Sequence, residues 1–181
     1  LTDKERETAF AESSLLSRMS HSNVLEYVTS FIEGDTLHIV TAFCDGGDLA
    51  QLIKARKETK AYLEEDVIVD IFLQLAMAVD YCHSMRIMHR DLKTGNVFIT
   101  KKNVVKLGDF GIAKVLEHTM DSAKTVVGTP YYMAPEIVQG HRYNEKSDMW
   151  ALGCVLYEMA TLNHAFESSN LLGLVYAIVQ T

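Results

Sequence analysis

The sequence has few of the residues that mark several specialised classes of protein. Its three cysteines are widely spaced and form no C-x-x-C pair, which argues against a disulfide framework and against a cysteine zinc site. Only two prolines and ten glycines occur, so collagen-like and low-complexity chains are excluded. No uninterrupted apolar run approaches the ~18 residues of a membrane span, and no segment resembles a signal peptide.

Positive charge is also in short supply. The formal net charge is −7, whereas a general binder of nucleic acid or of anionic membrane is basic. Hydrophobic residues make up 48% of the chain, which is enough for a sizeable core. We therefore predict a globular protein of a reducing intracellular compartment, with no nucleic-acid and no membrane partner. Because the chain begins at Leu1 and not at methionine, we also expect a piece of a longer protein.

Hydrophobic periodicity predicts an α+β architecture with two parts. Two apolar runs around E-G-D indicate a hairpin, the glycine pair at 46–47 breaks the pattern, and Asp48 can cap the helix that follows. The expected helices cover residues 4–19 and 63–85, a third begins at Ser147 as its N-cap, and a fourth begins at 170. The expected strands are the hairpin within 24–43 and the short runs 86–88, 97–99 and 104–107. A long loop is expected at 109–136, and the boundary between a β-rich part, 1–43, and a helical part, 44–181, falls after the hairpin.

A polar stretch, H-R-D-L-K-T-G-N at 89–96, lies between two apolar runs. Taken alone, its H-R-D triplet has an ordinary explanation as a solvated turn. Two motifs further along the chain change that interpretation, because D-F-G stands at 109–111 directly after an expected strand and A-P-E stands at 134–136. Asp91, Asn96 and Asp109 then supply oxygen atoms near strand ends, which suits Mg²⁺ and phosphate, and Lys93 adds a positive charge.

These motifs, in this order, resemble the signature set of protein kinases. The segments FCDGGDL, HRDLKTGNVF, KLGDFGIAK and TVVGTPYYMAPE are similar to those of the NIMA-related serine/threonine kinases. The resemblance implies a truncated two-lobed kinase fold, from the helix lettered C and two strands of the small lobe to the start of helix G. It implies an ATP- and Mg²⁺-dependent enzyme that phosphorylates Ser and Thr of protein substrates.

The resemblance also assigns roles to individual residues. Asp91 would be the catalytic base, Asn96 and Asp109 would hold Mg²⁺, and Lys93 would contact the transferred phosphate. The implied nucleotide-binding residues are Thr41 as the gatekeeper, Ala42 and Cys44 at the adenine edge, Asp48 at the ribose, Phe98 beneath the adenine, and Glu12. Glu12 fits the glutamate of helix C that pairs with a strand lysine, although it could also be one more solvated acid.

Regulation is implied by the same resemblance. Thr125 would be phosphorylated by an activating kinase or by autophosphorylation in trans, and the phosphate would pair with Arg90. Thr129 would bond to the pair Asp91 and Lys93. The expected spine of side chains between the lobes consists of His89, Phe110, Leu16 and Tyr27, so His89 is predicted to be a packed residue and not a metal ligand. Asp148, on an apolar helix, is predicted to orient the backbone of the catalytic loop.

The sequence departs from the kinase pattern at both ends. It contains neither the G-x-G-x-x-G-x-V loop nor the V-A-I-K lysine, and Lys4 stands too close to the first helix to replace that lysine. We therefore expect the 181 residues alone to be inactive. A pseudokinase or scaffold that binds partners without phosphoryl transfer stays open as the alternative. The family resemblance implies a cytoplasmic location, with cytoskeletal, centrosomal or ciliary association.

Overall fold

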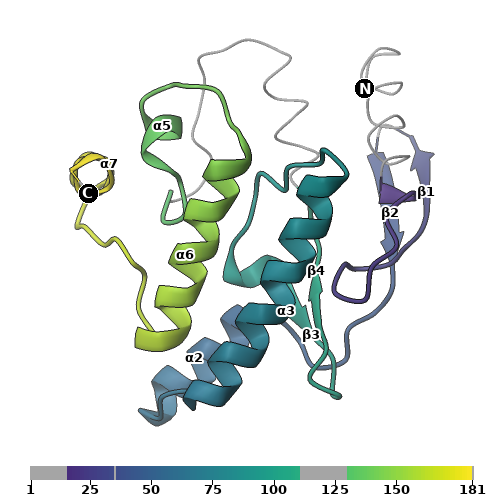
Figure 1. Cartoon of the computed structure of the whole chain (residues 1–181), viewed down its shortest axis with the longest axis horizontal. Coiled ribbons are helices and arrows are strands. Elements are labelled where there is room, and N and C mark those ends of the chain that lie inside the picture. Colours follow the sequence, from purple (N-terminus) through teal and green to yellow (C-terminus); the bar gives the residue numbers. More distant parts are fainter. Residues whose placement is uncertain (1–15, 35, 111–129, 181) are drawn as a thin grey trace.

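The computed structural model describes residues 16–34, 36–110 and 130–180 (Figure 1). The elements are β1 (Tyr27–Glu33), β2 (Thr36–Thr41), α2 (Leu49–Thr59), α3 (Glu65–Ser84), the 3₁₀ turn η1 (Thr94–Asn96), β3 (Val97–Ile99), β4 (Val105–Leu107), α5 (Pro135–Val138), α6 (Glu145–Thr161) and α7 (Leu171–Val179). Figure 1 shows the β1–β2 hairpin at one side of the molecule and α6 and α7 at the other. The helix α3 and the β3–β4 pair lie between them.

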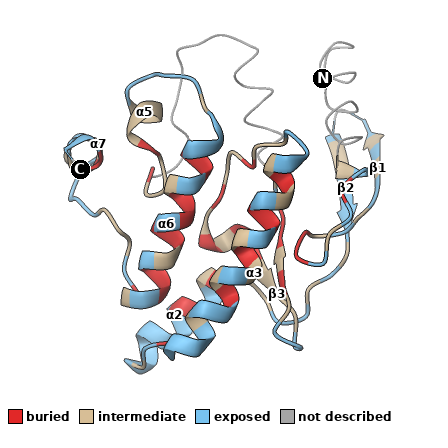
Figure 2. Cartoon of the chain, in the orientation of Figure 1, coloured by how far each residue is buried: buried red, intermediate tan, exposed pale blue. Residues whose placement is uncertain are grey.

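The helix α3 is the centre of the core. Its buried side chains recur at three- and four-residue spacing and are Ile71, Leu75, Ala78, Val79 and Cys82, as the periodicity of 63–85 predicts. They face α6 on one side and β4 on the other (Figure 2). Burying a side chain such as Leu75 contributes roughly 1.5–3 kcal/mol. By length and composition alone α3 could cross a membrane, but its apolar face is packed against α6 and β4.

The hairpin of β1 and β2 confirms the predicted pair of strands around E-G-D. The strands are antiparallel, with Glu33 opposite Thr36 at the turn, and Gly34 adopts a φ of 60°, a conformation that glycine reaches without a steric cost. The hairpin is joined to the rest of the fold through β4, where the N–H of Leu25 donates to Leu107 O at 2.8 Å. Several of its apolar side chains, including Val28 and Phe31, are exposed.

The segment after β2 is fixed to the edge of β3. The N–H of Gly46 donates to Ile99 O at 3.0 Å, and the N–H of Ile99 donates to Gly47 O at 2.9 Å. Asp48 then caps α2, because its Oδ1 accepts a hydrogen bond from the N–H of Gln51 at 2.9 Å. These contacts confirm the predicted cap and hold the connection between hairpin and helices beside the short β3–β4 sheet.

Replacement of Gly46 by alanine is expected to destabilise the fold. A Cβ atom at this position would lie 2.5 Å from Ile99 O, a backbone atom that cannot move without breaking the contact with Gly46. We expect Gly46→Ala to lower the free energy of unfolding by about 1–3 kcal/mol, as overpacking does. The matched control is Gly153→Ala in α6, where nothing lies within 4 Å and the higher helix propensity of alanine should add about 0.5–1 kcal/mol. Urea unfolding of both variants checks the prediction, and equal stabilities would contradict it.

Two local predictions are wrong. The N-cap of α6 is Asn144 and not Ser147, which is instead the N3 residue of a capping box and donates from its Oγ to Glu136 Oε1 at 2.5 Å. Residues 86–88 are not a strand. They follow the end of α3 in a turn with a φ of 61° at Arg86, and the N–H groups of Arg86 and Ile87 are taken by carbonyl oxygens of the last turn of the helix. No strand among the described residues pairs with this segment.

Two further predicted elements lie in the later part of the chain, and one of them needs an adjustment. The helix α7 begins after the cap Asn170, as expected from 170 onwards. Within the predicted loop 109–136, the described residues 130–134 are irregular, but Pro135 begins the one-turn helix α5, because proline suits the first position of a helix. The helix predicted over 4–19 lies almost wholly outside the described residues.

Candidate active site

The polar stretch at 89–96, the expected catalytic loop, brings three of the predicted residues together. Lys93 Nζ lies 2.8 Å from Asp91 Oδ2. Asn96, held in the 3₁₀ turn η1, donates from Nδ2 to Asp91 Oδ2 at 2.9 Å and to Asp91 O at 2.7 Å. The carboxylate of Asp91 therefore accepts from a cation and from an amide at the same oxygen, which fixes its orientation.

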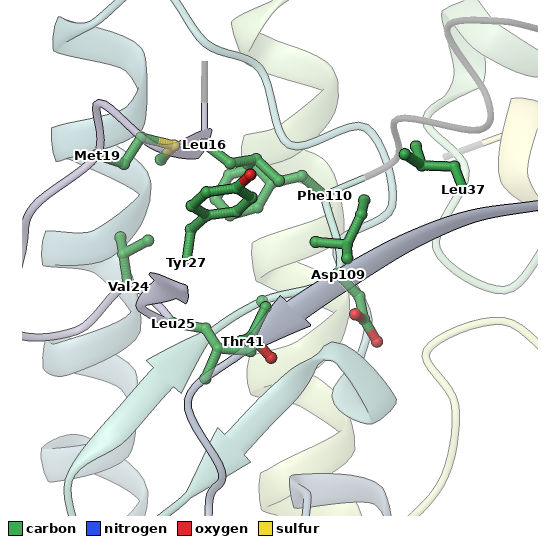
Figure 3. Close-up of a pocket in the computed structure, with 11 residues that line it drawn as sticks. Leu16, Met19, Val24, Leu25, Tyr27, Leu37, Thr41, Asp109 and Phe110 are labelled. Carbon is green, nitrogen blue, oxygen red and sulfur yellow. The ribbon is translucent and has the colours of Figure 1, made fainter. Parts of the chain in front are cut away.

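Asp109 is attached to the same group through the backbone. Asn96 Nδ2 also lies 3.3 Å from Asp109 O, and the N–H of Gly108 donates to Asn96 O at 3.0 Å. Asp109 itself has a φ of 51°, a left-handed conformation that aspartate tolerates better than most residues. Figure 3 shows its carboxylate directed away from the rings of Tyr27 and Phe110.

This donor set fits a hard cation bound together with phosphate. The amide nitrogen of Asn96 is engaged with Asp91 and Asp109, so its carbonyl oxygen is the end left to meet a ligand. The side chain of Asp109 is exposed, and carboxylate and amide oxygens are what Mg²⁺ prefers. Mg²⁺ usually takes one or two protein carboxylates and completes its shell with water and substrate phosphates, so Asn96 and Asp109 are suitable ligands.

Asp148, on α6, binds the backbone of the catalytic loop. It is completely buried in the first turn of α6. Its two oxygens accept from the N–H of His89 at 2.9 Å, the N–H of Arg90 at 3.1 Å, Tyr143 Oη at 2.5 Å and His83 Nε2 at 2.8 Å. Burial and the carboxylate of Asp148 raise the pKa of Tyr143 well above its usual value, so that hydroxyl stays a donor.

The predicted orienting role of Asp148 is thus confirmed in its geometry, since it holds two consecutive backbone amides. Its side-chain partners, His83 and Tyr143, escaped the sequence reasoning. His83 carries a weak signal, because it is a polar residue near the end of a largely apolar helix. Tyr143 carries none, since a tyrosine before a helix has many ordinary explanations.

His89 is a packed residue, as predicted. It is 1% exposed, its Nε2 donates to Gly108 O at 2.9 Å, and its Nδ1 accepts from the N–H of Asp91 at 3.3 Å. Its ring lies against Phe110 with a centroid distance of 4.6 Å. Figure 3 shows Phe110 close to Tyr27 and Leu16, so the four predicted spine residues are brought together. Because Nδ1 is an acceptor here, a second proton has no place, and burial lowers the pKa of His89.

The stability of the fold should therefore fall in mild acid. The pKa of His89 is lowered from 6.5 in the folded state, so below pH 6.5 the unfolded chain binds a proton that the folded chain does not. The stability due to neutral His89 is complete above pH 6.5 and is lost as the pH falls below it. We expect urea midpoints measured between pH 7.5 and 5 to decline less steeply in His89→Phe, which is less stable throughout. Equal pH dependence in the two proteins would contradict this role.

Most of the predicted nucleotide residues lie in or next to residues 42–44, the expected hinge, which connects the hairpin to α2. The N–H of Ala42 donates to Glu26 O at 2.8 Å, so only the carbonyl of Ala42 can face a ligand. Cys44 is half-buried, and desolvation raises the pKa of its thiol. Asp48 forms a β-bridge with Phe98 on β3. The structure thus brings Asp48 and Phe98 together next to the hinge.

Thr41 lines a cavity of about 400 Å³ behind this hinge. Its walls come from both parts of the chain and are Leu16, Met19, Val24, Leu25, Tyr27, Leu37, Ile39, Thr41, Gly108, Asp109 and Phe110 (Figure 3). Among the described residues that line it, Asp109 is the acidic one, and it links the cavity to the catalytic loop. The expected gatekeeper therefore stands where an apolar space meets the charged residues.

Three predicted residues cannot be placed. Glu12, Thr125 and Thr129 lie outside the described residues. Arg90, the expected partner of a phosphate on Thr125, is half-buried with a φ of 66°, and its N–H is bound by Asp148. Asp148 on α6 therefore stabilises the backbone conformation at Arg90.

A second buried acid beside the loop was also missed. Glu158, in the last turn of α6, accepts a short hydrogen bond from Tyr132 Oη and lies 3.5 Å from Thr94 Oγ1. Burial and Glu158 raise the pKa of Tyr132, so the tyrosine donates. The signal was present in the sequence, because Glu158 interrupts the same apolar helix from which the role of Asp148 was predicted.

The model of the protein kinase domain matches residues 1–181. The chain belongs to the protein kinase family. It is 49% identical to the mouse (Mus musculus) serine/threonine-protein kinase Nek1 over 99% of this chain and 15% of that protein, and 49% identical to mouse Nek4 over 99% of this chain and 22% of that protein. It is 46% identical to human (Homo sapiens) Nek5 over 98% of this chain and 25% of that protein.

These relatives confirm the predicted resemblance to NIMA-related serine/threonine kinases. The fold is confirmed by the crystal structure of Rad53 1-466 in complex with AMP-PNP, which this kinase domain matches with a TM-score of 0.82 and 29% identity over 96% of this chain and 43% of that one. The chain spans between 15% and 25% of the length of the three Nek relatives.

Proposed function

We propose that the protein carrying this chain is a protein serine/threonine kinase that transfers the γ-phosphoryl group of ATP to Ser and Thr hydroxyls of protein substrates. One observation carries the proposal: Asp91, Lys93 and Asn96 converge within hydrogen-bonding distance, and Asn96 ties them to Asp109. A base, a cation and two oxygen ligands at one place are the parts that phosphoryl transfer needs from a protein.

Asp91 acts as the base. Its carboxylate accepts the proton of the substrate hydroxyl, and the contacts from Lys93 and Asn96 to Oδ2 hold that carboxylate in position. Lys93 is close enough to Asp91 to neutralise charge on both the carboxylate and a phosphate placed beside it. Because little covalent chemistry is asked of the protein, its contribution is positioning and electrostatic stabilisation.

Mg²⁺ and ATP are the expected cofactors, and Mg²⁺ would offset the negative charge of the phosphates. Asn96 and Asp109 would hold the metal ion. The hinge would bind the nucleotide through the carbonyl of Ala42 and the backbone of Cys44, with Asp48 near the ribose and Phe98 against the adenine. The cavity lined by Thr41 would then lie beyond the adenine.

The same proposal includes three residues that lie outside the described ones. Glu12 would pair with a strand lysine, Thr129 would bond to Asp91 and Lys93, and Thr125 would be phosphorylated. A phosphate on Thr125, added by an activating kinase or by a second copy, would add roughly −1.5 to −2 charge. Arg90 would bind it, and the hydrogen bond from Arg90 N to Asp148 would connect the phosphate to the catalytic loop.

The test uses the full-length gene product. Phosphate transfer from ATP–Mg²⁺ is followed with a mixed peptide set in which the acceptor is serine, threonine or tyrosine. We expect transfer to serine and threonine and none to tyrosine. Nucleotide binding without transfer, after the activating phosphate has been supplied, would replace the proposal by a binding scaffold.

A further inference from the structure

His164 lies in the segment that follows α6 and contacts three residues of the candidate active site. Its ring is stacked on Tyr131 with a centroid distance of 3.9 Å and an interplanar angle of 11°, and it meets Tyr132 edge-on at 6.1 Å. Its Nδ1 lies 3.5 Å from Glu158 Oε2. The segment itself is pinned further along, where Phe166 stacks on Trp150 at 5.5 Å.

The contact with Glu158 has an electrostatic reason. Glu158 is 6% exposed, and a carboxylate so deeply buried needs donors or a positive partner. Tyr132 Oη and Thr94 Oγ1 supply two donors. Within the described residues Nδ1 of His164 is buried and makes no hydrogen bond, and the carboxylate of Glu158 is the polar group that it faces, at 3.5 Å.

The contacts form a continuous path from α6 to the catalytic loop. Tyr132 Oη lies 3.0 Å from Thr94 Oγ1, and Thr94 is three residues beyond Asp91, a span of at most about 10 Å. A polypeptide that delivers a hydroxyl to Asp91 must therefore place its neighbouring residues close to Tyr131 and Tyr132. His164 contacts both tyrosines, and Glu158 accepts a hydrogen bond from Tyr132.

We propose that His164 is a positioning residue for the protein substrate: by pairing with Glu158 and stacking on Tyr131, it holds the tyrosine pair against the catalytic loop. The inference rests on the proposed kinase function and adds a determinant of substrate binding to it. The contacts of His164 are with Tyr131, Tyr132 and Glu158, and the predicted nucleotide residues are others. Loss of the contact should therefore weaken binding of the peptide and leave binding of the nucleotide unchanged.

Two substitutions test the contributions of the ring and of the Nδ1 atom of His164 separately. His164→Phe keeps a flat ring for Tyr131 and removes the polar atom that faces Glu158. His164→Asn places an amide nitrogen near the position of Nδ1 and removes the ring. In the full-length protein we expect His164→Phe to raise KM for a serine peptide about fivefold, which is the size of one ordinary polar contact. We expect KM for ATP and kcat to stay within about twofold.

His164→Asn should recover most of the lost peptide affinity, because the amide can donate to Glu158. A wild type that transfers no phosphate would remove the proposed function and this inference with it. An active wild type with an unchanged peptide KM in His164→Phe would overturn this inference alone. A uniform loss in peptide KM, ATP KM and kcat in both variants would also overturn it, because that result indicates a structural role only.

Discussion

Asp91→Asn should abolish phosphoryl transfer while the protein still folds and binds nucleotide. An amide has nearly the shape of a carboxylate and can still accept from Lys93 and Asn96, so the loop keeps its geometry. It cannot accept the proton of the substrate hydroxyl. General-base catalysis contributes roughly 10²–10⁴-fold, and we expect kcat of the full-length protein to fall by about 10³-fold with KM for ATP little changed.

Asp80→Asn is the matched control for this substitution. Asp80 is an exposed acid on α3, so the same change of charge there should leave kcat within about twofold. Single-turnover phosphate transfer measures the chemical step directly. If Asp91→Asn kept a tenth or more of the activity, Asp91 would not be the base, and the reaction would have to rely on orientation by Asn96 and neutralisation by Lys93.

The parts of the site that could be predicted are those that lie close together in the chain. Asp91, Lys93 and Asn96 fall within six residues, and Asp109 follows the next hairpin, so their motifs determine their proximity. The helix α3 was predictable for a related reason, because its buried residues repeat with the period of the helix. In both cases the information is local, and packing against the rest of the fold only confirms it.

The parts that could not be predicted depend on contacts between distant residues. His83 reaches Asp148 across 65 positions, and Tyr132 reaches Glu158 across 26. A single sequence does not show which donor meets a buried acid, only that some donor must. The N-cap of α6 was predicted wrongly for a local reason. Asparagine and serine are about equally good N-caps, and Asn144 and Ser147 stand three residues apart. The strand predicted at 86–88 was wrong because so short a run, with only two apolar residues, does not distinguish a strand from the turn after a helix.

Asp148→Ala should cause the largest loss of stability among the substitutions considered. The carboxylate is completely buried and accepts hydrogen bonds from two backbone amides and two side chains. Removing it leaves four donors without their acceptor, and each unsatisfied buried donor costs about 1–3 kcal/mol. Relaxation and water entry will recover part of that, so we expect the free energy of unfolding to fall by about 4 kcal/mol.

Asp148→Asn tests the effect of the lost hydrogen bonds on stability without a change in the size of the side chain. The amide keeps one acceptor oxygen and turns a nitrogen toward a donor, so we expect it to lose about half as much stability as alanine does. Urea unfolding of both variants, with Asp80→Ala as an exposed control, gives the comparison. A loss below about 1 kcal/mol for Asp148→Ala, less than the cost of one unsatisfied donor, would show that His83 and Tyr143 do not depend on this carboxylate. The backbone at His89 and Arg90 would then be held in place by the packing of His89 against Phe110.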